Sequence, residues 1–257
     1  VFDKFAYHFT DHFRVMGITR RGYGLSSKPK KGYDLATRVA DNIKVLDHFK
    51  FTKAIFVGPS IAGVELSRLG AEFPDRVTRL VYLDAYDYGP LHDLIKFDPD
   101  VGPDGQFTQR DGNSPQHMDA AIGRVLGYRA VTADTCNLYH VYKSGKLGAY
   151  KTSGDISKAI ISGSGMADFE KITAPALGIF ARPQAAPPYV SLLTDDQKER
   201  YNASMQKSAV WQADVIERFS SGIKNVQVLE LPNAPHYFFL THEGDIVHLI
   251  RTFLLGQ

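Results

Sequence analysis

A serine stands in a short run of small residues between an apolar strand and a helix. The apolar run 54–57 predicts a strand, and residues 58–63 (GPSIAG) follow it at once. A sharp strand-to-helix turn strains the backbone of its central residue and needs small residues two positions to either side, which Gly58 and Ala62 provide. The hydroxyl of Ser60 would lie at a helix N-terminus, where free N–H groups stabilise developing negative charge. The pattern indicates a nucleophile; the simpler interpretation is a serine that caps the helix.

A serine nucleophile needs a base, and His236 lies where a base is expected. The run 226–231 predicts the last strand, and His236 follows it in the loop 232–237 (PNAPHY). Because sites of parallel sheets collect at the carboxyl ends of their strands, this location favours a catalytic imidazole over a surface or capping histidine. His242 and His248 lie in or beside the predicted terminal helix and are expected to be exposed.

A third group must orient the imidazole, and Asp84 is the predicted acid. It directly follows the predicted strand 79–83, one helix and one strand after Ser60, so the two residues are expected at the same edge of the sheet. The strand predicted at 176–180 is followed by no carboxylate before Asp195. Two alternatives stay open: Asp84 only caps its loop, or Asp87 is the acid.

Apolar strands alternate with amphipathic helices along most of the chain. This alternation predicts an α/β fold, with a mostly parallel sheet that is covered by helices on both faces. The strands are expected at 13–19, 54–57, 79–83, 176–180 and 226–231, and the helices at 35–49, 61–73, 195–219 and 245–254.

The alternation stops over residues 86–171, where glycine, proline, aspartate and tyrosine are frequent. Short helices are expected there at 118–126 and 133–142. We interpret the stretch as an inserted lid over the site, so that 1–85 and 172–257 are the two parts of the core domain. Tyr86, Tyr88, Met118 and Tyr139 are the predicted substrate contacts, although side chains of these types also simply pack a lid.

Composition narrows the class of partner. Of the 257 residues, 44% are hydrophobic and 23% are charged. This length and hydrophobic content suffice for one large domain with its own core. Thirty basic and 28 acidic side chains leave a formal charge of +2, and such a small net charge gives no reason to expect a nucleic-acid or membrane partner. A small-molecule substrate is therefore expected. No apolar run approaches the roughly 18 residues of a membrane span. The compartment and the oligomeric state are left open.

No metal or cofactor is predicted. His92, His117 and His140 have no metal-ligand spacing to carboxylates or to the single Cys136. The run 163–165 (GSG) lacks the glycine pattern and the helix of a phosphate-binding loop.

Taken together, these motifs resemble the α/β-hydrolase fold over nearly the whole chain. The elbow 58–63 and the histidine loop together are the most specific part of the resemblance. The similar stretches are 13–29, 58–63 (GPSIAG), 74–77 (PDRV) and 232–236 (PNAPH).

The resemblance implies a serine esterase with Ser60, His236 and Asp84 as its triad and the N–H of Ile61 as an oxyanion donor. Some members of the fold place the acid after the strand that follows the elbow, where Asp84 falls. Haloalkane dehalogenases and epoxide hydrolases have an aspartate at the position of Ser60. The chain is similar to serine esterases that include enzymes opening macrolide lactones, which implies hydrolysis of an ester or lactone. Alternatives are another acyl or carbon–carbon hydrolase on the same triad, or a non-catalytic ligand-binding receptor.

The chain departs from the family pattern in two respects. Pro59 precedes the serine where the family usually has histidine, which removes an N–H that is not an oxyanion donor there. The family also has about three strands and a loop with the second oxyanion donor before the part that Val1 begins, so we expect about 40 or more residues to precede Val1. Without them, the strands at 13–19 and 54–57 would face an empty position, and activity would fall by about 10²–10³-fold.

Overall fold

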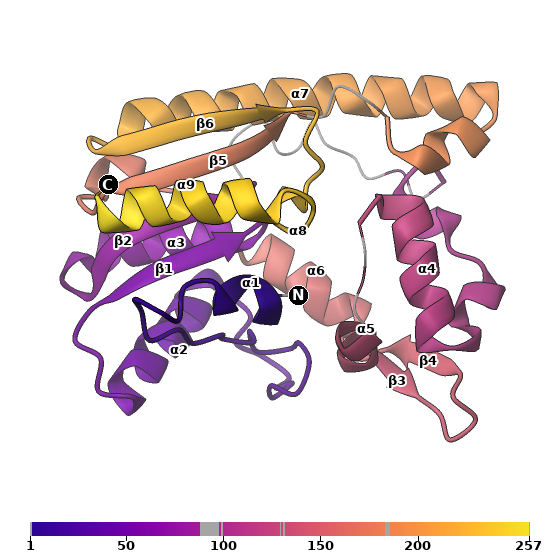
Figure 1. Cartoon of the computed structure of the whole chain (residues 1–257), viewed down its shortest axis with the longest axis horizontal. Coiled ribbons are helices and arrows are strands. Elements are labelled where there is room, and N and C mark those ends of the chain that lie inside the picture. The colour runs from indigo at the N-terminus through magenta and orange to yellow at the C-terminus, as the bar shows by residue number, and fades with distance from the viewer. Residues whose placement is uncertain are drawn as a thin grey trace.

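The computed structural model describes residues 2–87, 98, 100–128, 130, 132–182 and 186–256. Within these residues the main sheet has four parallel strands in the order β1-β2-β5-β6 (Figure 1). The strands are β1 (Ala54–Pro59), β2 (Val77–Leu83), β5 (Ala176–Arg182) and β6 (Val226–Pro232). Because all four run the same way, their carboxyl ends meet at one edge of the sheet.

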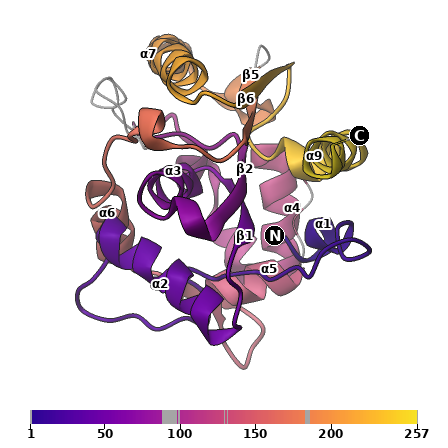
Figure 2. The same ribbon diagram turned by 90° about the vertical axis from the view of Figure 1, so that its left-hand side faces the viewer.

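Helices cover both faces of this sheet (Figure 2). One face carries α2 (Leu35–His48), α3 (Ala62–Glu72) and the C-terminal half of α7 (Asp195–Gly222). The other carries α1 (Asp3–Tyr7), α8 (Phe238–Thr241) and α9 (Glu243–Leu255). The predicted α/β architecture is therefore confirmed.

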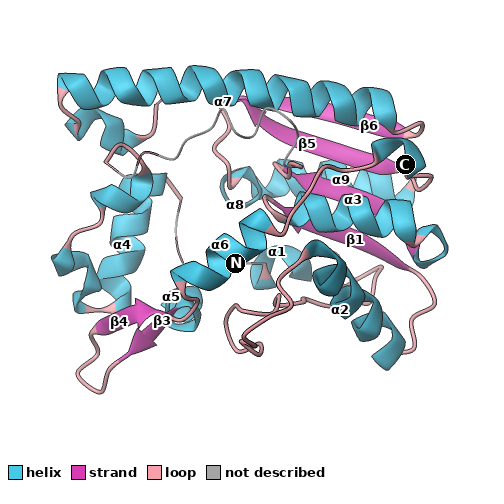
Figure 3. Cartoon of the chain, turned by 180° about the vertical axis from the view of Figure 1, so that it is seen from behind, coloured by secondary structure: helices cyan, strands magenta, loops and turns pink. Residues whose placement is uncertain are grey.

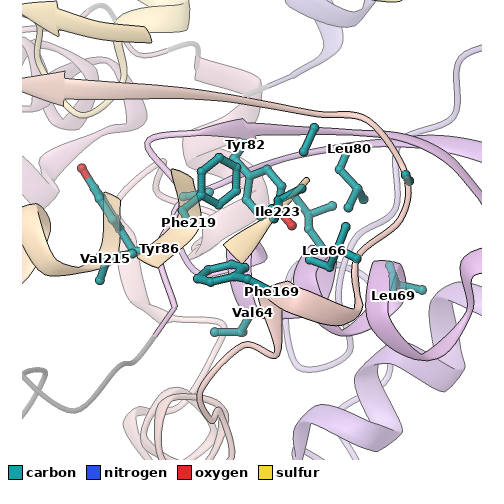
Figure 4. Packing of buried hydrophobic residues seen from close by; sticks show 14 of the residues in the cluster. Val64, Leu66, Leu69, Leu80, Tyr82, Tyr86, Phe169, Val215, Phe219 and Ile223 are labelled. Carbon is teal, nitrogen blue, oxygen red and sulfur yellow. The ribbon is translucent and has the colours of Figure 1, made fainter. Parts of the chain in front are cut away.

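Each face has its own hydrophobic core. On the α3 side, the ring of Tyr82 of β2 packs against that of Phe219 of α7 with centroids 4.8 Å apart, and Leu80 belongs to the same cluster (Figure 4). On the α9 side, Val81 and Leu83 of the same strand pack into the second cluster. Alternate side chains of a strand point to opposite faces, so a strand segment that is buried on both sides is apolar at every position, as β2 is from Leu80 to Leu83.

Local signals in the sequence explain where the main helices begin. The carboxylate of Asp34 accepts the N–H of Thr37 at 2.9 Å and caps α2. Thr194 and Gln197 form a capping box at the start of α7, in which each side chain binds the backbone of the other residue.

The described residues between β2 and β5 form what we call the cap, which contains α4 (Pro115–Leu126), α5 (Thr132–Leu138), the hairpin of β3 (Tyr139–Val141) and β4 (Leu147–Tyr150), and α6 (Gly154–Ser162). The helices α4 and α5 and the hairpin lie to one side of the sheet (Figure 3). In contrast, α6 lies next to α2 (Figure 2), and the N–H of Leu35 donates to the carbonyl oxygen of Gly163 at 2.9 Å.

Short 3₁₀ helices occupy Pro74–Arg76, Pro103–Gln106, Gln109–Asn113, Phe169–Lys171 and Pro188–Leu192.

The N-terminal half of α7 packs on the cap, and its C-terminal half packs on the sheet (Figure 1). Val101 and Val125 of the cap form a third cluster with Tyr189, Leu193 and Tyr201. One helix therefore connects the cap and the sheet, which the sequence pattern did not predict.

Two local predictions were wrong. Residues 13–19 form no strand; a strand needs a hydrogen-bonded neighbour, and in the described residues β1 pairs with β2 alone. The helix expected over 133–142 ends at Leu138, because the turn at Gly145, where φ is +85°, folds the following residues into the β3–β4 hairpin.

No helix in the described part of the chain is both long enough and apolar enough to cross a membrane.

Candidate active site

Ser60 lies in the turn between β1 and α3 with a backbone φ of +52°. This left-handed conformation is strained for a residue with a Cβ, and it is typical of residues held for function. A Cβ added to Gly58 would lie 2.6 Å from the Cβ of Ala62, so the turn is as tight as the sequence predicted. The backbone of Ile61 caps α3, where the first N–H groups of the helix lack intrahelical partners.

The register of the sheet places Ser60 beside Asp84. Pro59 pairs with Leu83, and the N–H of Ser60 donates to the carbonyl oxygen of Leu83 at 3.3 Å. Asp84 also has a positive φ, of +47°, and its N–H donates to the carbonyl oxygen of Ile179 at 2.7 Å. Two neighbouring strands therefore end in strained turns that present a hydroxyl and a carboxylate at one edge.

His236 reaches the same carboxylate from the loop after β6. Its Nδ1 lies 2.5 Å from Oδ2 of Asp84. The loop begins at Asn233, where φ is +59° and the N–H donates to the carbonyl oxygen of Arg182 at 2.9 Å. The side chain of Asp84 is 4% exposed and that of His236 is 39% exposed, so the imidazole lies between a buried anion and solvent.

This hydrogen bond fixes the orientation of the imidazole. An ionised carboxylate only accepts hydrogen bonds, so Nδ1 of His236 carries the proton that it donates to Asp84. The neutral ring then has its lone pair at Nε2, which can accept a proton from another group. The hydrogen bonds of the described residues include none between Oγ of Ser60 and His236.

Asp87, the alternative acid, is bound to a different partner. Its side chain is fully buried, and its two oxygens accept hydrogen bonds from Arg218 of α7 at 2.7 and 2.8 Å. The N–H of Ala167 also donates to it at 3.0 Å. Hydrogen bonds to Asp87 raise the pKa of the Arg218 guanidinium, which therefore stays charged. The structure thus brings Asp84, and not Asp87, to His236.

Tyr86 is buried, and its hydroxyl donates to Oδ1 of Asp84. The N–H of Ala181 donates to the same oxygen at 2.8 Å. The sequence predicted Tyr86 as a substrate contact; the short i to i+2 spacing from Asp84 was the only signal for this hydrogen bond.

The other predicted substrate contacts lie in the cap or outside the described residues. Met118 is a buried residue of α4, and the ring of Tyr139 at the start of β3 packs against Tyr150 with centroids 5.2 Å apart. Tyr88 lies outside the described residues.

The cap contacts the histidine loop through Tyr128, an aromatic residue of the inserted stretch for which the sequence predicted no specific contact. The ring centroid of Tyr128, just after α4, lies 4.8 Å from that of Tyr237, which in turn lies 4.8 Å from that of His236. Burial, and then the neighbouring Tyr237, raises the pKa of the Tyr128 hydroxyl. Aromatic side chains of the cap and the core therefore meet beside the imidazole.

Glu65 places a negative charge in the first turn of α3, close to the serine. Its carboxylate accepts hydrogen bonds from Arg20 at 2.5 Å and from the buried Arg38 at 2.9 Å. Since two guanidiniums offset this charge, Glu65 leaves the field of the helix N-terminus favourable to an anion.

No group of three or more His, Cys, Asp or Glu side chains that could hold a metal ion occurs in the described residues.

Comparison with known proteins identifies the class. Residues 1–113 match the family model of the alpha/beta hydrolase fold. A non-heme chloroperoxidase of Streptomyces lividans is 24% identical over 242 residues, which cover 90% of this chain and 77% of the relative. The crystal structure of E-2-(acetamidomethylene)succinate hydrolase superposes with a TM-score of 0.69 at 18% identity, and covers 98% of this chain and 85% of that one. The enol-lactonase from Burkholderia xenovorans LB400 gives 0.60 at 20% identity, with coverage of 99% and 84%.

The chain has the α/β-hydrolase fold, and it is an enzyme of the hydrolase class. The resemblance to this fold, drawn from the elbow and the histidine loop, is therefore confirmed.

Proposed function

We propose that the protein is a serine hydrolase that cleaves a carboxylic ester or a lactone through Ser60, His236 and Asp84. The observation that carries the proposal is the hydrogen bond from His236 to the buried Asp84, at the sheet edge where Ser60 occupies a strained turn. A hydroxyl nucleophile, an imidazole base and an orienting carboxylate are the groups that acyl transfer requires.

In the proposed first step, Nε2 of His236 takes the proton of Ser60 while Oγ attacks the carbonyl carbon. The N–H of Ile61, at the start of α3, donates to the oxyanion that forms. His236 then gives its proton to the departing alkoxide, so that the C–O bond breaks and an acyl-enzyme remains.

In the second step, His236 takes a proton from water, and the resulting hydroxide attacks the acyl carbon. Oγ of Ser60 leaves and recovers the proton from the imidazolium, and the acid product is released. Throughout both steps, Asp84 keeps the proton of the neutral ring on Nδ1 and stabilises the imidazolium.

The substrate class follows from the surroundings of the imidazole. The ring of Tyr237 packs against that of His236, and the ring of Tyr128 packs against that of Tyr237, and such aromatic surroundings suit a neutral substrate with a large apolar part. Similar structures include an enol-lactonase, which supports ester-like bonds as targets. We include bulky lactones such as macrolides in the proposed class.

The test is hydrolysis by the wild-type protein and its Ser60→Ala variant on a panel of p-nitrophenyl esters, small lactones and a macrolide lactone. We expect turnover of at least one ester or lactone, and a loss on the order of 10⁶-fold in kcat for the variant, with an unchanged circular dichroism spectrum. Activity that survives Ser60→Ala, or activity on amides, thioesters or carbon–carbon bonds only, would contradict the proposal.

A further inference from the structure

We propose that Tyr86 is a positioning residue of the active site: its hydroxyl holds the Asp84 carboxylate in the orientation and charge balance that His236 requires. This inference rests on the proposed function, because it assigns a role in the Ser60–His236–Asp84 reaction.

The carboxylate of Asp84 divides its two oxygens between two tasks. Oδ2 accepts the Nδ1 proton of His236, and Oδ1 accepts the Tyr86 hydroxyl and the N–H of Ala181. A carboxylate that is bound at both oxygens cannot rotate about its Cβ–Cγ bond without losing hydrogen bonds. Tyr86 and Ala181 therefore fix the direction from which Asp84 reaches the imidazole.

The ring of Tyr86 is itself held in place. It is 8% exposed and belongs to the core cluster on the α3 side of the sheet, as Figure 4 shows. Its centroid lies 4.9 Å from that of Trp211 and 5.6 Å from that of Phe180. The backbone of Tyr86 also contacts Gly63, where an added Cβ would lie 2.7 Å from the Tyr86 carbonyl oxygen. The hydroxyl is thus presented by a rigid side chain.

The hydroxyl remains a donor at every pH at which the imidazole changes charge. Burial, and then the Asp84 carboxylate, raises the pKa of Tyr86 above its ordinary value of 10.0. Raising the pH towards 10 therefore leaves the proton on the oxygen, and the hydrogen bond to Asp84 persists through neutral and mildly alkaline conditions.

Removing the Tyr86 hydroxyl should shift the pH dependence of activity in a predictable direction. An Asp84 carboxylate with one donor fewer is a less stabilised anion, and it attracts the imidazolium form of His236 more strongly. The base then stays protonated to higher pH, and activity on the acid side is lost at a higher pH than in the wild type. Other charged groups also face the Asp84–His236 pair and the segment that carries Asp84. They are the ion pair of Arg182 with Glu230 and that of Asp87 with Arg218, and both remain unchanged in the Tyr86 variants.

The experiment compares Tyr86→Phe with the wild type in p-nitrophenyl acetate hydrolysis and in the rate of inactivation by a fluorophosphonate, each as a function of pH. We expect the acid-side midpoint of kcat/KM to move up by about 0.5–1 pH unit. We expect kcat to fall by about 3- to 30-fold and KM to change less than about twofold, because the lost contact acts on the base and not on substrate binding.

Tyr82→Phe is the matched control. Tyr82 is also buried and lies in β2, the strand that Asp84 and Tyr86 follow, and its hydroxyl forms a hydrogen bond with that of Ser67 at 3.1 Å, away from Asp84. Its variant loses a buried tyrosine hydroxyl as well, but its pH profile should match that of the wild type. Equal shifts in the two variants, or no shift in Tyr86→Phe, would overturn the inference.

If Tyr86→Phe does not fold, the same pH profiles are measured with 3-fluorotyrosine incorporated at position 86, and they test the inference instead. Fluorine makes the hydroxyl a stronger donor and adds little volume, so the acid-side midpoint should move down; an unmoved midpoint overturns the inference.

The proposed function fails in a different way. If the fluorophosphonate does not label Ser60, both ideas fall; if it labels Ser60 and the Tyr86 variants keep the wild-type profile, only the role of Tyr86 falls.

Discussion

Two buried carboxylates, three residues apart, leave the end of β2 in different directions. The side chains of Asp84 and Asp87 are 4% and 0% exposed, and each accepts a backbone N–H in addition to a charged or titratable side chain. Asp84 faces His236 at the sheet edge, whereas Asp87 faces Arg218 of α7.

The partner, and not the degree of burial, separates the two sites. A guanidinium keeps its charge at every ordinary pH, so the pair of Asp87 with Arg218 is permanent and suited to holding structure. An imidazole gains and loses a proton near neutral pH, so the pair of Asp84 with His236 can take part in proton transfer. Asp87 also accepts the N–H of Ala167, and it thereby ties both junctions of the cap to α7.

The largest effect that separates the two sites is expected for Asp84→Asn. The amide keeps the shape of the side chain but no longer stabilises an imidazolium, and it allows the wrong tautomer of His236. We expect kcat to fall by roughly 10⁴-fold in ester hydrolysis. The thermal unfolding midpoint serves as the control for folding, and a loss below tenfold would argue that another group orients the base.

Asp87→Asn should mainly reduce stability and affect catalysis little. The change leaves the Arg218 guanidinium without its buried partner, although Arg218 is 28% exposed and keeps Asp214 at 2.9 Å. We expect the free energy of unfolding to fall by about 2–4 kcal/mol, with kcat reduced far less than in Asp84→Asn. Urea denaturation measures the first quantity.

Arg200→Gln is the control for Asp87→Asn. Arg200, on the exposed part of α7, forms ion pairs with Asp98 and Asp196, and solvent screens these pairs. Its variant should unfold at the wild-type urea concentration; a loss of stability equal to that of Asp87→Asn would remove the distinction between a buried clamp and a surface pair.

The smallest expected effect concerns the backbone between the two carboxylates. A Cβ on Gly63 would lie 2.8 Å from the backbone nitrogen of Tyr86 and 2.9 Å from the carbonyl carbon of Ala85. Gly63→Ala should therefore displace this segment and reduce the free energy of unfolding by about 1–3 kcal/mol. Gly123→Ala in α4, where the nearest atom is 3.7 Å away, should be neutral or stabilising; equal effects would show that the contact at Gly63 relaxes freely.

The elements that the sequence predicted well are those with strong periodicity. The strands at β1, β2, β5 and β6 and the helices α2, α3, α7 and α9 follow from apolar runs and from spacings of three and four residues. The run 13–19, in which Arg14 and Gly17 lie among apolar residues, forms no strand, because pairing depends on a neighbour and not on the run itself.

The sequence predicted the main residues of the site but not all of the partners that these residues contact. Strand ends and the elbow predicted Ser60, Asp84 and His236 at one edge, since topology alone brings parallel strand ends together. The sequence favoured Asp84 as the acid but left Asp87 open, because Arg218, the partner of Asp87, is 131 residues away in the chain. The role of the Tyr86 hydroxyl and the contact of Tyr128 with Tyr237 depend on tertiary packing, which leaves no local pattern.

The most direct test of the central claim is covalent labelling by a fluorophosphonate, followed by mass-spectrometric mapping of the modified residue. We predict a single modified residue, Ser60, with labelling that is slowed at least about 10²-fold by Asp84→Asn and little changed by Asp87→Asn. Modification at another residue, or equal rates in the two aspartate variants, would contradict the account.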